Sequence, residues 1–417
     1  MQNVDSGDFV EDSATGATVS VSPVTASTYD VTLSGGTLAS HNGVVGINLI
    51  GLPTIEDLAG NALPAGEPGT DETYVLDNTD PTDPTVSSTS HTTSTWSNDD
   101  TIDIQVSGAY DESGVDGFNT AWDQSATWIA TEVKNQEETW DGGTFTATSN
   151  GNWYFHIATV DNVGNWTSTV HLGPFYIDTT PPSVPTGLSP ANGAHINITN
   201  PVFSWTASTD SGGSGLRDTD RYSYVVDGTL QDRSGYVMNT TYQATDLVEE
   251  VYTWKIWARD NADNDSAYTS DYTLTIDLTA PGLNSFERSA PAASPTNADT
   301  LVFLVTFDED VQNVDPTDFE ADSTSTATVT AVNPVGGGPT YDTYEVTVSG
   351  GDLATHTYSG TVGIDLAAGQ NITDLAGNPL PASEPATDET YTVDNDPPTI
   401  SIGAPSATDT NTGPVTY

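Results

Sequence analysis

The sequence predicts an all-β protein made of a string of β-sandwich domains in an elongated array. Glycine (37 residues) and proline (25 residues) are plentiful, and threonine, serine, valine and tyrosine are common, a mixture that favours strands and turns over helices. No window carries a sustained apolar stripe at helical spacing. A chain of 417 residues is expected to hold about three or four domains.

Two stretches of the sequence are copies of one another. Residues Gln2–Thr82 reappear almost completely in Gln312–Thr399. Both copies contain, in the same order, Q-N-V-D, a Leu or Val followed by S-G-G, V-G-I, D-L-A-G-N, L-P-A and D-E-T-Y. The D-L-A-G-N motif lies at Asp57–Asn61 and at Asp374–Asn378. Since repeats this similar adopt one fold, both copies are expected to form the same kind of domain.

The copies differ in their flanking sequence. Pro281–Val311 precedes the second copy and contains T-L-V-F-L-V-T-F, which predicts a buried strand, whereas the first copy has no such segment before it. Pro398–Tyr417 is similar to the opening strands of a further domain. Two explanations stay open: the chain is an excerpt from a longer tandem array, or the C-terminal strands of one molecule complete the N-terminal domain of the next by strand addition.

Two further units of about 100 residues lie between the copies. Thr101–Val106 alternates apolar and polar residues, as a half-buried strand does. A late strand in each unit alternates large apolar residues and runs into an Asp-Asn turn, at Asp161-Asn162 and at Asp260-Asn261. Strands that recur about every 8–12 residues, with turn residues between them, predict β-sandwiches. The expected domains are 1–80 (lacking its first strands), 81–180, 181–279, 280–396 (complete) and 397–417 (opening strands of a further domain).

These motifs resemble those of bacterial surface proteins. Asp111–Gly117 (D-E-S-G-V-D-G), Val160–Asn165 (V-D-N-V-G-N) and Ile177–Pro182 (I-D-T-T-P-P) make the middle units similar to fibronectin type III or immunoglobulin-like modules. The D-L-A-G-N and V-D-N-D-P-P motifs make the flanking copies similar to the bacterial Ig-like repeats of very large adhesins. The resemblance implies secretion to the cell surface, a stalk stiffened by Ca²⁺, and ligand-binding domains elsewhere in the polypeptide.

The charge of the chain excludes some partners. Against 59 Asp and Glu there are 7 Lys and Arg, a net charge of −52 at pH 7, so nucleic acid and anionic lipid surfaces are not expected as partners. Bound cations, high salt or an elongated form would offset this self-repulsion, and a halophilic surface is the alternative to bound metal. The absence of cysteine excludes disulfides and thiolate chemistry, and no apolar run is long enough to span a membrane.

Calcium is the predicted cofactor, in a structural role. Ca²⁺ binds six to eight oxygen atoms from carboxylates, Asn side chains and carbonyl groups, and many of the acids stand in Asp-Asn-Gly turns. The alternative is that these residues only form tight turns through local hydrogen bonds. The candidate ligands are Asp57, Asp77, Asn78 and Asp80 in the first unit; Asp111, Glu112, Asp161, Asn162, Asn165 and Asp178 in the second; Asp210, Asp260, Asn261, Asn264 and Asp277 in the third; and Asp374, Asp394, Asn395 and Asp396 in the fourth. In the second unit the early acidic loop is expected to meet the Asp-Asn turn, and two places stay open for Asp178: this cluster or the next junction.

Catalysis is not expected. The carboxylates recur with the repeat, whereas a catalytic pair would be a single cluster. The six histidines are scattered without an H-x-x-x-H or H-E-x-x-H motif, and neither G-x-S-x-G nor a phosphate-binding glycine loop occurs.

The sequence therefore predicts a non-enzymatic stalk or filament segment of a large extracellular protein, involved in adhesion or surface display. Its neighbouring domains would be held by Pro-rich linkers and Ca²⁺ at the junctions. The alternative is a polysaccharide-binding module that binds a surface glycan on exposed tryptophans. Packing of these tryptophans in a sandwich core would explain them without a ligand. The tryptophans concerned are Trp96, Trp122, Trp128, Trp140 and Trp166 of unit 81–180.

Overall fold

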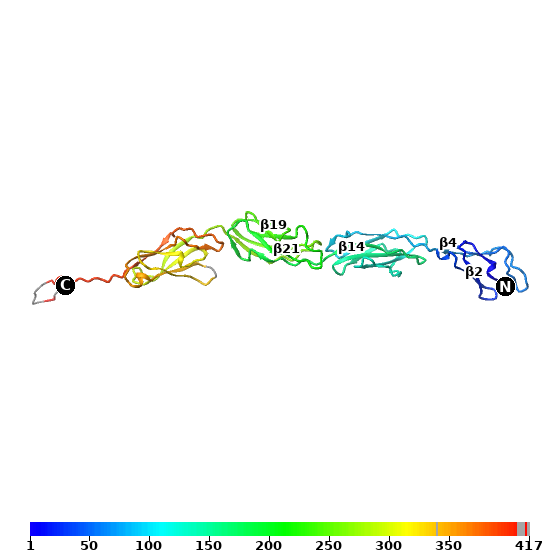
Figure 1. Ribbon diagram of the computed structural model, residues 1–417, viewed down its shortest axis with the longest axis horizontal. Coiled ribbons are helices and arrows are strands. Elements are labelled where there is room, and N and C mark those ends of the chain that lie inside the picture. Colours follow the sequence, from blue (N-terminus) through cyan, green and yellow to red (C-terminus); the bar gives the residue numbers. More distant parts are fainter. Residues whose placement is uncertain (339–340, 407–412, 415–417) are drawn as a thin grey trace. The chain divides into compact units, whose positions relative to one another are not determined.

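The computed structural model describes residues 1–338, 341–406 and 413–414, and almost all of its regular structure is β-strand (Figure 1). The prediction of a string of β-sandwich domains is confirmed. The described residues contain no helix with the length and apolarity that a membrane crossing requires. The helical segments are short: η1 (Ser6–Asp8), η2 (Leu38–Ser40), η3 (Pro316–Asp318) and α1 (Gly351–Ala354).

The second sandwich pairs a five-stranded sheet, in the order β11-β10-β13-β14-β8, with the three-stranded sheet β12-β9-β7. The alternation predicted at Thr101–Val106 is confirmed, because every second residue of β9 is buried. The late strand β13 buries Trp153, Phe155 and Ile157 against this sheet. The strands are β7 (Thr85–Ser88), β8 (Trp96–Ser97), β9 (Thr101–Ser107), β10 (Val115–Asp123), β11 (Gln136–Glu137), β12 (Gly142–Thr146), β13 (Gly151–Asp161) and β14 (Val170–Ile177).

The third sandwich repeats this plan, with sheets β16-β22-β21-β18-β19 and β15-β17-β20. Its late strand β21 buries Tyr252, Trp254 and Ile256, as the alternation predicts. The strands are β15 (Thr186–Ser189), β16 (Ala194–Ile196), β17 (Val202–Thr206), β18 (Tyr222–Asp227), β19 (Asp232–Val237), β20 (Thr241–Gln243), β21 (Glu250–Ala258) and β22 (Tyr272–Ile276).

The fourth sandwich has a six-stranded sheet, β26-β27-β24-β23-β30 with β29 also paired to β24, and the three-stranded sheet β25-β28-β31. The T-L-V-F-L-V-T-F segment forms β24 and buries four apolar side chains, as predicted. The strands are β23 (Leu283–Ala290), β24 (Thr300–Gln312), β25 (Phe319–Asp322), β26 (Thr328–Pro334), β27 (Tyr341–Ser349), β28 (Gly360–Leu366), β29 (Thr373–Asp374), β30 (Thr387–Asp388) and β31 (Tyr391–Val393).

The first copy of the repeat forms only three two-stranded sheets, β1-β5, β2-β3 and β4-β6. Its buried hydrophobic residues are Val45 and Ile55, so the described residues of this region build little core. The strands are β1 (Phe9–Glu11), β2 (Thr18–Pro23), β3 (Tyr29–Ser34), β4 (Gly43–Val45), β5 (Ile47–Leu49) and β6 (Tyr74–Leu76).

Contacts between Cα atoms divide the chain into two compact units. One contains residues 1–183 with the loops 209–217 and 259–265, and the other contains residues 184–208, 218–258 and 266–417. These units do not follow the predicted domain boundaries, which stay a prediction. Residues 397–406 form no strand, and most of the opening strands predicted beyond them lie outside the described residues.

Candidate functional site

One five-residue turn occurs four times. In each copy the backbone N–H of the first residue, an aspartate, donates to the carbonyl oxygen of the fifth, an asparagine, at 2.9–3.1 Å. The asparagine Nδ2 donates back to the aspartate Oδ2 at 2.7–2.8 Å. The fourth residue has a positive φ, which explains why it is glycine in three copies and aspartate in the other. We call these the D-x-x-x-N turns: Asp57–Asn61, Asp161–Asn165, Asp260–Asn264 and Asp374–Asn378.

In three of the four turns the asparagine also holds the linker that enters its sandwich. Its Nδ2 donates to a backbone carbonyl of the segment that ends the preceding sandwich. The same side chain thus fixes the turn and a residue 86 to 101 positions earlier in the sequence. The contacts are Asn165 with Asp77 (3.1 Å), Asn264 with Asp178 (2.8 Å), and Asn378 with Asp277 and Thr279 (3.0 Å each).

Each of these three turns belongs to a cluster of three carboxyl groups. One carboxylate is the turn aspartate, the second closes the preceding sandwich, and the third comes from an early segment of the same sandwich as the turn. One oxygen from each lies within 4.8 Å of the others. We call the clusters A (Asp77, Asp111, Asp161), B (Asp178, Asp210, Asp260) and C (Asp277, Glu309, Asp374).

Local hydrogen bonds fix the turn carboxylates. Asp161, Asp260 and Asp374 are at most 1% exposed. In Asp161, Oδ1 accepts from three backbone N–H groups, whereas Oδ2 accepts only from the Asn165 side chain. A carboxylate oxygen has two lone pairs, so one lone pair of Oδ2 stays available to a further donor or a cation.

The early acidic loops are tied to the turns by a second asparagine in clusters A and B. Asn162 Nδ2 donates to the carbonyl of Ser113 at 2.8 Å, and Asn261 Nδ2 donates to the carbonyl of Ser214 at 3.0 Å. Both serines follow the third acid of their cluster closely in sequence. The second asparagine of the D-N-x-x-N sequence therefore positions the loop, while the last asparagine positions the linker.

The three charges of a cluster repel one another strongly. At an effective dielectric constant near 20, two unit charges 4.8 Å apart interact by about 3 kcal/mol, and each cluster contains three such pairs. In clusters B and C burial is the main cause of raised pKa values, and repulsion between the carboxylates adds to it. Burial, with the charge of Asp178, raises the pKa values of Asp210 and Asp260. Burial and the neighbouring carboxylates raise the pKa of Glu309 to about 7.

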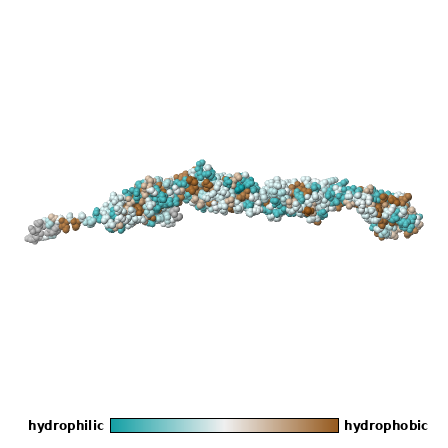
Figure 2. All heavy atoms as spheres, in the orientation of Figure 1, coloured by the Kyte–Doolittle hydropathy of each residue, from teal (hydrophilic) through white to brown (hydrophobic). Residues whose placement is uncertain are grey.

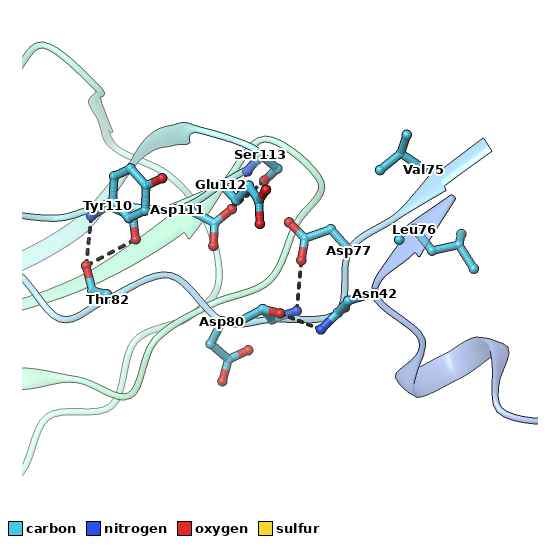
Figure 3. Close-up of a pocket in the computed structure, with 12 residues that line it drawn as sticks. Asn42, Val75, Leu76, Asp77, Asp80, Thr82, Tyr110, Asp111, Glu112 and Ser113 are labelled. Carbon is cyan, nitrogen blue, oxygen red and sulfur yellow. Dashed lines mark hydrogen bonds between the residues drawn. The ribbon is translucent and has the colours of Figure 1, made fainter. Parts of the chain in front are cut away.

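Cluster A is more open. Its carboxylates of Asp77 and Asp111 line a pocket of about 470 Å³ together with Glu112. Figure 3 shows the Asp77 side chain pointing toward Asp111 and Glu112. Here the backbone N–H of Thr79 donates to Asp77 at 3.0 Å and is the main cause that lowers the pKa of this carboxyl.

The structure places Asp111 beside Asp161 and Asp210 beside Asp260, in the groups that the sequence gives them, and metal binding there stays a prediction. Asp77 and Asp277 join the turn of the sandwich that follows instead of the turn of their own unit, and Asp178, whose place the sequence left open, does so too. Sequence reasoning missed Glu309. Its signal was available, because Glu309 follows Asp277 by the same 32 residues by which Asp210 follows Asp178.

The other predicted ligands lie outside these clusters. Asp57 has both oxygens engaged within its own exposed turn. Asn78 and Asn395 are occupied in equivalent ways, each donating from Nδ2 to a nearby backbone carbonyl, of His41 and Tyr358 respectively. Asp394 accepts from the backbone N–H of Asp396, and Asp80 lines the cluster A pocket (Figure 3).

The tryptophans of the second sandwich divide into packed and open ones. Trp122 stacks on Trp153 at 5.4 Å, and Trp140 and Trp96 contact Phe155 and Tyr176. Two others line a separate pocket of about 560 Å³ that also contains a histidine. They are Trp128 and Trp166, with His171.

Comparisons with known proteins do not assign the chain to a family. No family model matches it. A stretch of 99 residues, 24% of the chain, is 36% identical to part of Exoglucanase B of Cellulomonas fimi, and the match covers 8% of that protein. The chain therefore corresponds to a small part of this relative's length.

Two solved structures illustrate the structural likeness. Chicken CNTN1 FN1–FN3 domains match 75% of this chain and 98% of theirs, at 13% identity and a TM-score of 0.26. Fibronectin(III)-like modules of Clostridium thermocellum CbhA match 46% of this chain and 94% of theirs, at 15% identity and a TM-score of 0.27. Because both TM-scores are low, the fold assignment rests on the sheets described above.

Proposed function

We propose that this chain is a non-catalytic structural segment of a secreted multidomain protein, and that Ca²⁺ bound at clusters A, B and C fixes each linker to the sandwich that follows it. The threefold recurrence of one arrangement carries the proposal. Each cluster takes one carboxylate from a linker and two from the next sandwich, so a shared cation would join them.

The donor set fits a hard divalent cation. Each cluster offers only oxygen ligands. Its three carboxylates carry negative charge, and Ca²⁺ binds preferentially to several carboxylate oxygens. Glu112 borders cluster A and offers it a fourth carboxylate. The chain has only 7 Lys and Arg against 59 acids, so its own cations neutralise a small part of this charge.

In this proposal the chain's own residues do most of the positioning. The D-x-x-x-N turn orients its aspartate, its last asparagine holds the linker backbone, and the linker aspartate then faces the turn. The cation supplies the attraction that keeps the three carboxylates together. Extracellular Ca²⁺ modules typically bind at about 10⁻⁴ to 10⁻³ M, which suits a permanently loaded structural site outside the cell. A role in surface display or adhesion is part of this proposal.

Calorimetry and thermal unfolding of the EDTA-treated full chain test the proposal. We expect about three Ca²⁺ per chain and a higher unfolding temperature, with each site contributing about 2.7 kcal/mol when Ca²⁺ is at 100 times its Kd. The matched control is the triple variant Asp161→Asn, Asp260→Asn and Asp374→Asn. If NaCl of equal ionic strength stabilises the protein as much as Ca²⁺ does, the clusters do not chelate and a halophilic surface is the better account.

A second candidate function is polysaccharide binding by the second sandwich. The pocket between Trp128 and Trp166 favours it, because aromatic faces with nearby polar groups suit sugar rings. Trp128 also stacks on His156, which is fully buried, so its ring is held in place. The match to part of a protein named Exoglucanase B is consistent with a role near polysaccharide.

Binding to insoluble glucans in EDTA separates the two functions. Trp128→Ala should remove such binding, whereas Trp257→Ala, in the third sandwich, should leave it unchanged. Retention of the chain by a glucan with both variants unaffected would contradict the pocket as the binding site.

A further inference from the structure

The outer face of strand β13 is covered in the second sandwich. Phe155 and Ile157 point into the core, so His156 between them points to the opposite face of the sheet. Antiparallel sheets commonly leave that face to water, yet His156 is 0% exposed. Trp128, from the loop 124–135 that follows β10, covers it, with the two rings stacked 5.6 Å apart. The loop therefore buries a polar side chain that needs hydrogen-bond partners there.

Hydrogen bonds fix this covering loop to the sheet. The Asn119 side chain on β10 accepts from the backbone N–H of Thr131 at 3.2 Å and donates to the carbonyl of Val133 at 2.6 Å. The Thr169 hydroxyl accepts from the backbone N–H of Ala130 at 3.1 Å. Since the loop is held at three points, the pocket that it lines needs little reorganisation to bind a ligand.

Three side chains on neighbouring strands form one hydrogen-bonded row under the loop. Oδ1 of Asp123 on β10 lies 3.3 Å from Nε2 of His156 on β13. Nδ1 of His156 lies 2.6 Å from Nδ1 of His171 on β14, and the two histidines stand directly opposite one another in the strand register. We call this the Asp-His-His row. It starts at a carboxylate and ends at His171, which is exposed and lines the pocket of Trp128 and Trp166.

The carboxylate fixes the positions of the protons along the row. An ionised carboxylate only accepts, so Nε2 of His156 carries the proton of its bond to Asp123. Burial lowers the pKa of His156 and favours its neutral form, in which Nδ1 is an acceptor. Nδ1 of His171 therefore donates, which leaves Nε2 of the neutral His171 ring as an acceptor. Among the described residues no hydrogen bond to this Nε2 is formed, and it points away from His156.

The third sandwich provides a matched comparison. Its residue five positions before the turn aspartate is Lys255, where the second sandwich has His156. Lys255 pairs with Asp271 at 3.3 Å and lies over the ring of Tyr268. A lysine ammonium only donates, so it cannot pass a fixed proton position to a neighbour as an imidazole does. Of these two sandwiches, the second therefore holds the row.

The charge and polarity around the pocket restrict its ligand. Glu132 lines the pocket and the chain has a net charge of −52, so an anionic ligand is repelled. A free acceptor nitrogen favours a ligand with hydroxyl donors, and tryptophan faces favour the apolar faces of sugar rings. On the face of the second sandwich shown in Figure 2, hydrophobic residues form only small patches, which favours a small polar ligand over a protein partner.

We propose that His171 selects the ligand of this pocket: its Nε2 accepts a hydrogen bond from a hydroxyl of an uncharged glycan whose ring lies on Trp128 or Trp166. Asp123 and His156 are positioning residues, because they hold His171 in the tautomer that leaves Nε2 unprotonated. This inference rests on the second candidate function, polysaccharide binding, and adds to it the selecting residue and the class of ligand.

Long-range ¹H–¹⁵N NMR spectra of the full chain, at a pH where both histidines are neutral, test the row. We expect His156 with its proton on Nε2 and His171 with its proton on Nδ1, the tautomer that free histidine disfavours in water. Asp123→Ala removes the acceptor and should leave His171 in a mixture of tautomers, whereas Asp123→Asn, whose side-chain oxygen still accepts, should keep the original spectrum. An unchanged spectrum in Asp123→Ala would overturn its positioning role.

Calorimetric titration of the full chain with cellohexaose, in EDTA, tests the ligand. We expect His171→Phe, which keeps a ring but has no acceptor, to weaken binding about five- to tenfold. His171→Gln, which can bring a side-chain oxygen near the position of Nε2, should weaken it less. Cellohexaose oxidised to carboxylates at C6 should bind more weakly than cellohexaose itself, because the pocket is acidic.

The outcomes separate this inference from the function on which it rests. If the unaltered chain does not bind cellohexaose, both the glycan function and this inference are overturned. If Trp128→Ala removes binding and His171→Phe leaves it unchanged, only the role of His171 is overturned. A proton on Nε2 of His171 in the unaltered chain has the same consequence. Equal affinity for the oxidised hexasaccharide overturns the restriction to uncharged glycans.

Discussion

The first and fourth sandwiches use nearly the same sequence and the same strand register, yet they differ in what surrounds the shared strands. In the fourth, β24 closes the core, and Asp374 and Asn378 of the turn are buried against a linker. In the first, a groove of about 620 Å³ is lined by residues of β3, β4, β5 and β6, and the turn Asp57–Asn61 is exposed. The comparison teaches that the repeat itself forms the turns and the strand pairs. The burial of its apolar side chains depends on segments outside the repeat.

The largest expected difference is between matched tyrosine variants. Tyr391→Ala should lower the free energy of unfolding of the fourth sandwich by about 3–5 kcal/mol, since it leaves a cavity beside Phe303 and removes a buried hydrogen bond. Tyr74→Ala should change stability by about 0.5 kcal/mol or less, because that ring is exposed. Urea unfolding followed by hydrogen exchange assigns each effect to its sandwich. Equal losses in the two variants would contradict the different burial of the two tyrosines.

The next difference concerns Ca²⁺. Asp374→Asn should remove cluster C and reduce the calorimetric stoichiometry by one Ca²⁺ per chain, because Asp374 is one of its three carboxylates. Asp57→Asn should leave the stoichiometry unchanged, because Asp57 belongs to no cluster of the described residues. A loss of one Ca²⁺ in the Asp57 variant would show that the isolated turn binds metal by itself.

A smaller difference is expected at the last asparagine of each turn. Asn378→Ala should cost about 1–3 kcal/mol, because it leaves the linker carbonyls of Asp277 and Thr279 without this donor. Asn61→Ala loses only the bond within its own turn and should cost about 1 kcal/mol. Thermal unfolding in EDTA compares the pair without the contribution of metal. A larger effect at Asn61 would contradict the role of Asn378 in holding the linker.

The sequence predicted the parts that depend on short-range patterns. The alternation in Thr101–Val106 and in the late strands, the equivalence of the two copies, and the Asp-Asn turns of the middle units all follow from spacing and turn chemistry. The sequence grouped Asp111 with Asp161, but it did not predict that Asp277 meets Glu309 and Asp374, because that contact depends on how a linker enters the next sandwich. Glu309 also lies in a strand, whereas the predicted ligands lie in turns, so turn motifs do not identify it.

Cluster C should also make stability depend on pH. Burial and neighbouring carboxylates raise the pKa of Glu309 from 4.5 to about 7, so between these values the folded state holds a proton that the unfolded state has released. In EDTA the stability contributed by Glu309 should therefore be greatest below about pH 4.5, fall as pH rises, and level off above pH 7. Added Ca²⁺ should displace this proton near pH 7, and its affinity should weaken toward acid pH. Glu309→Gln, which cannot ionise, should flatten the decline, and an unchanged decline would assign it to other carboxylates.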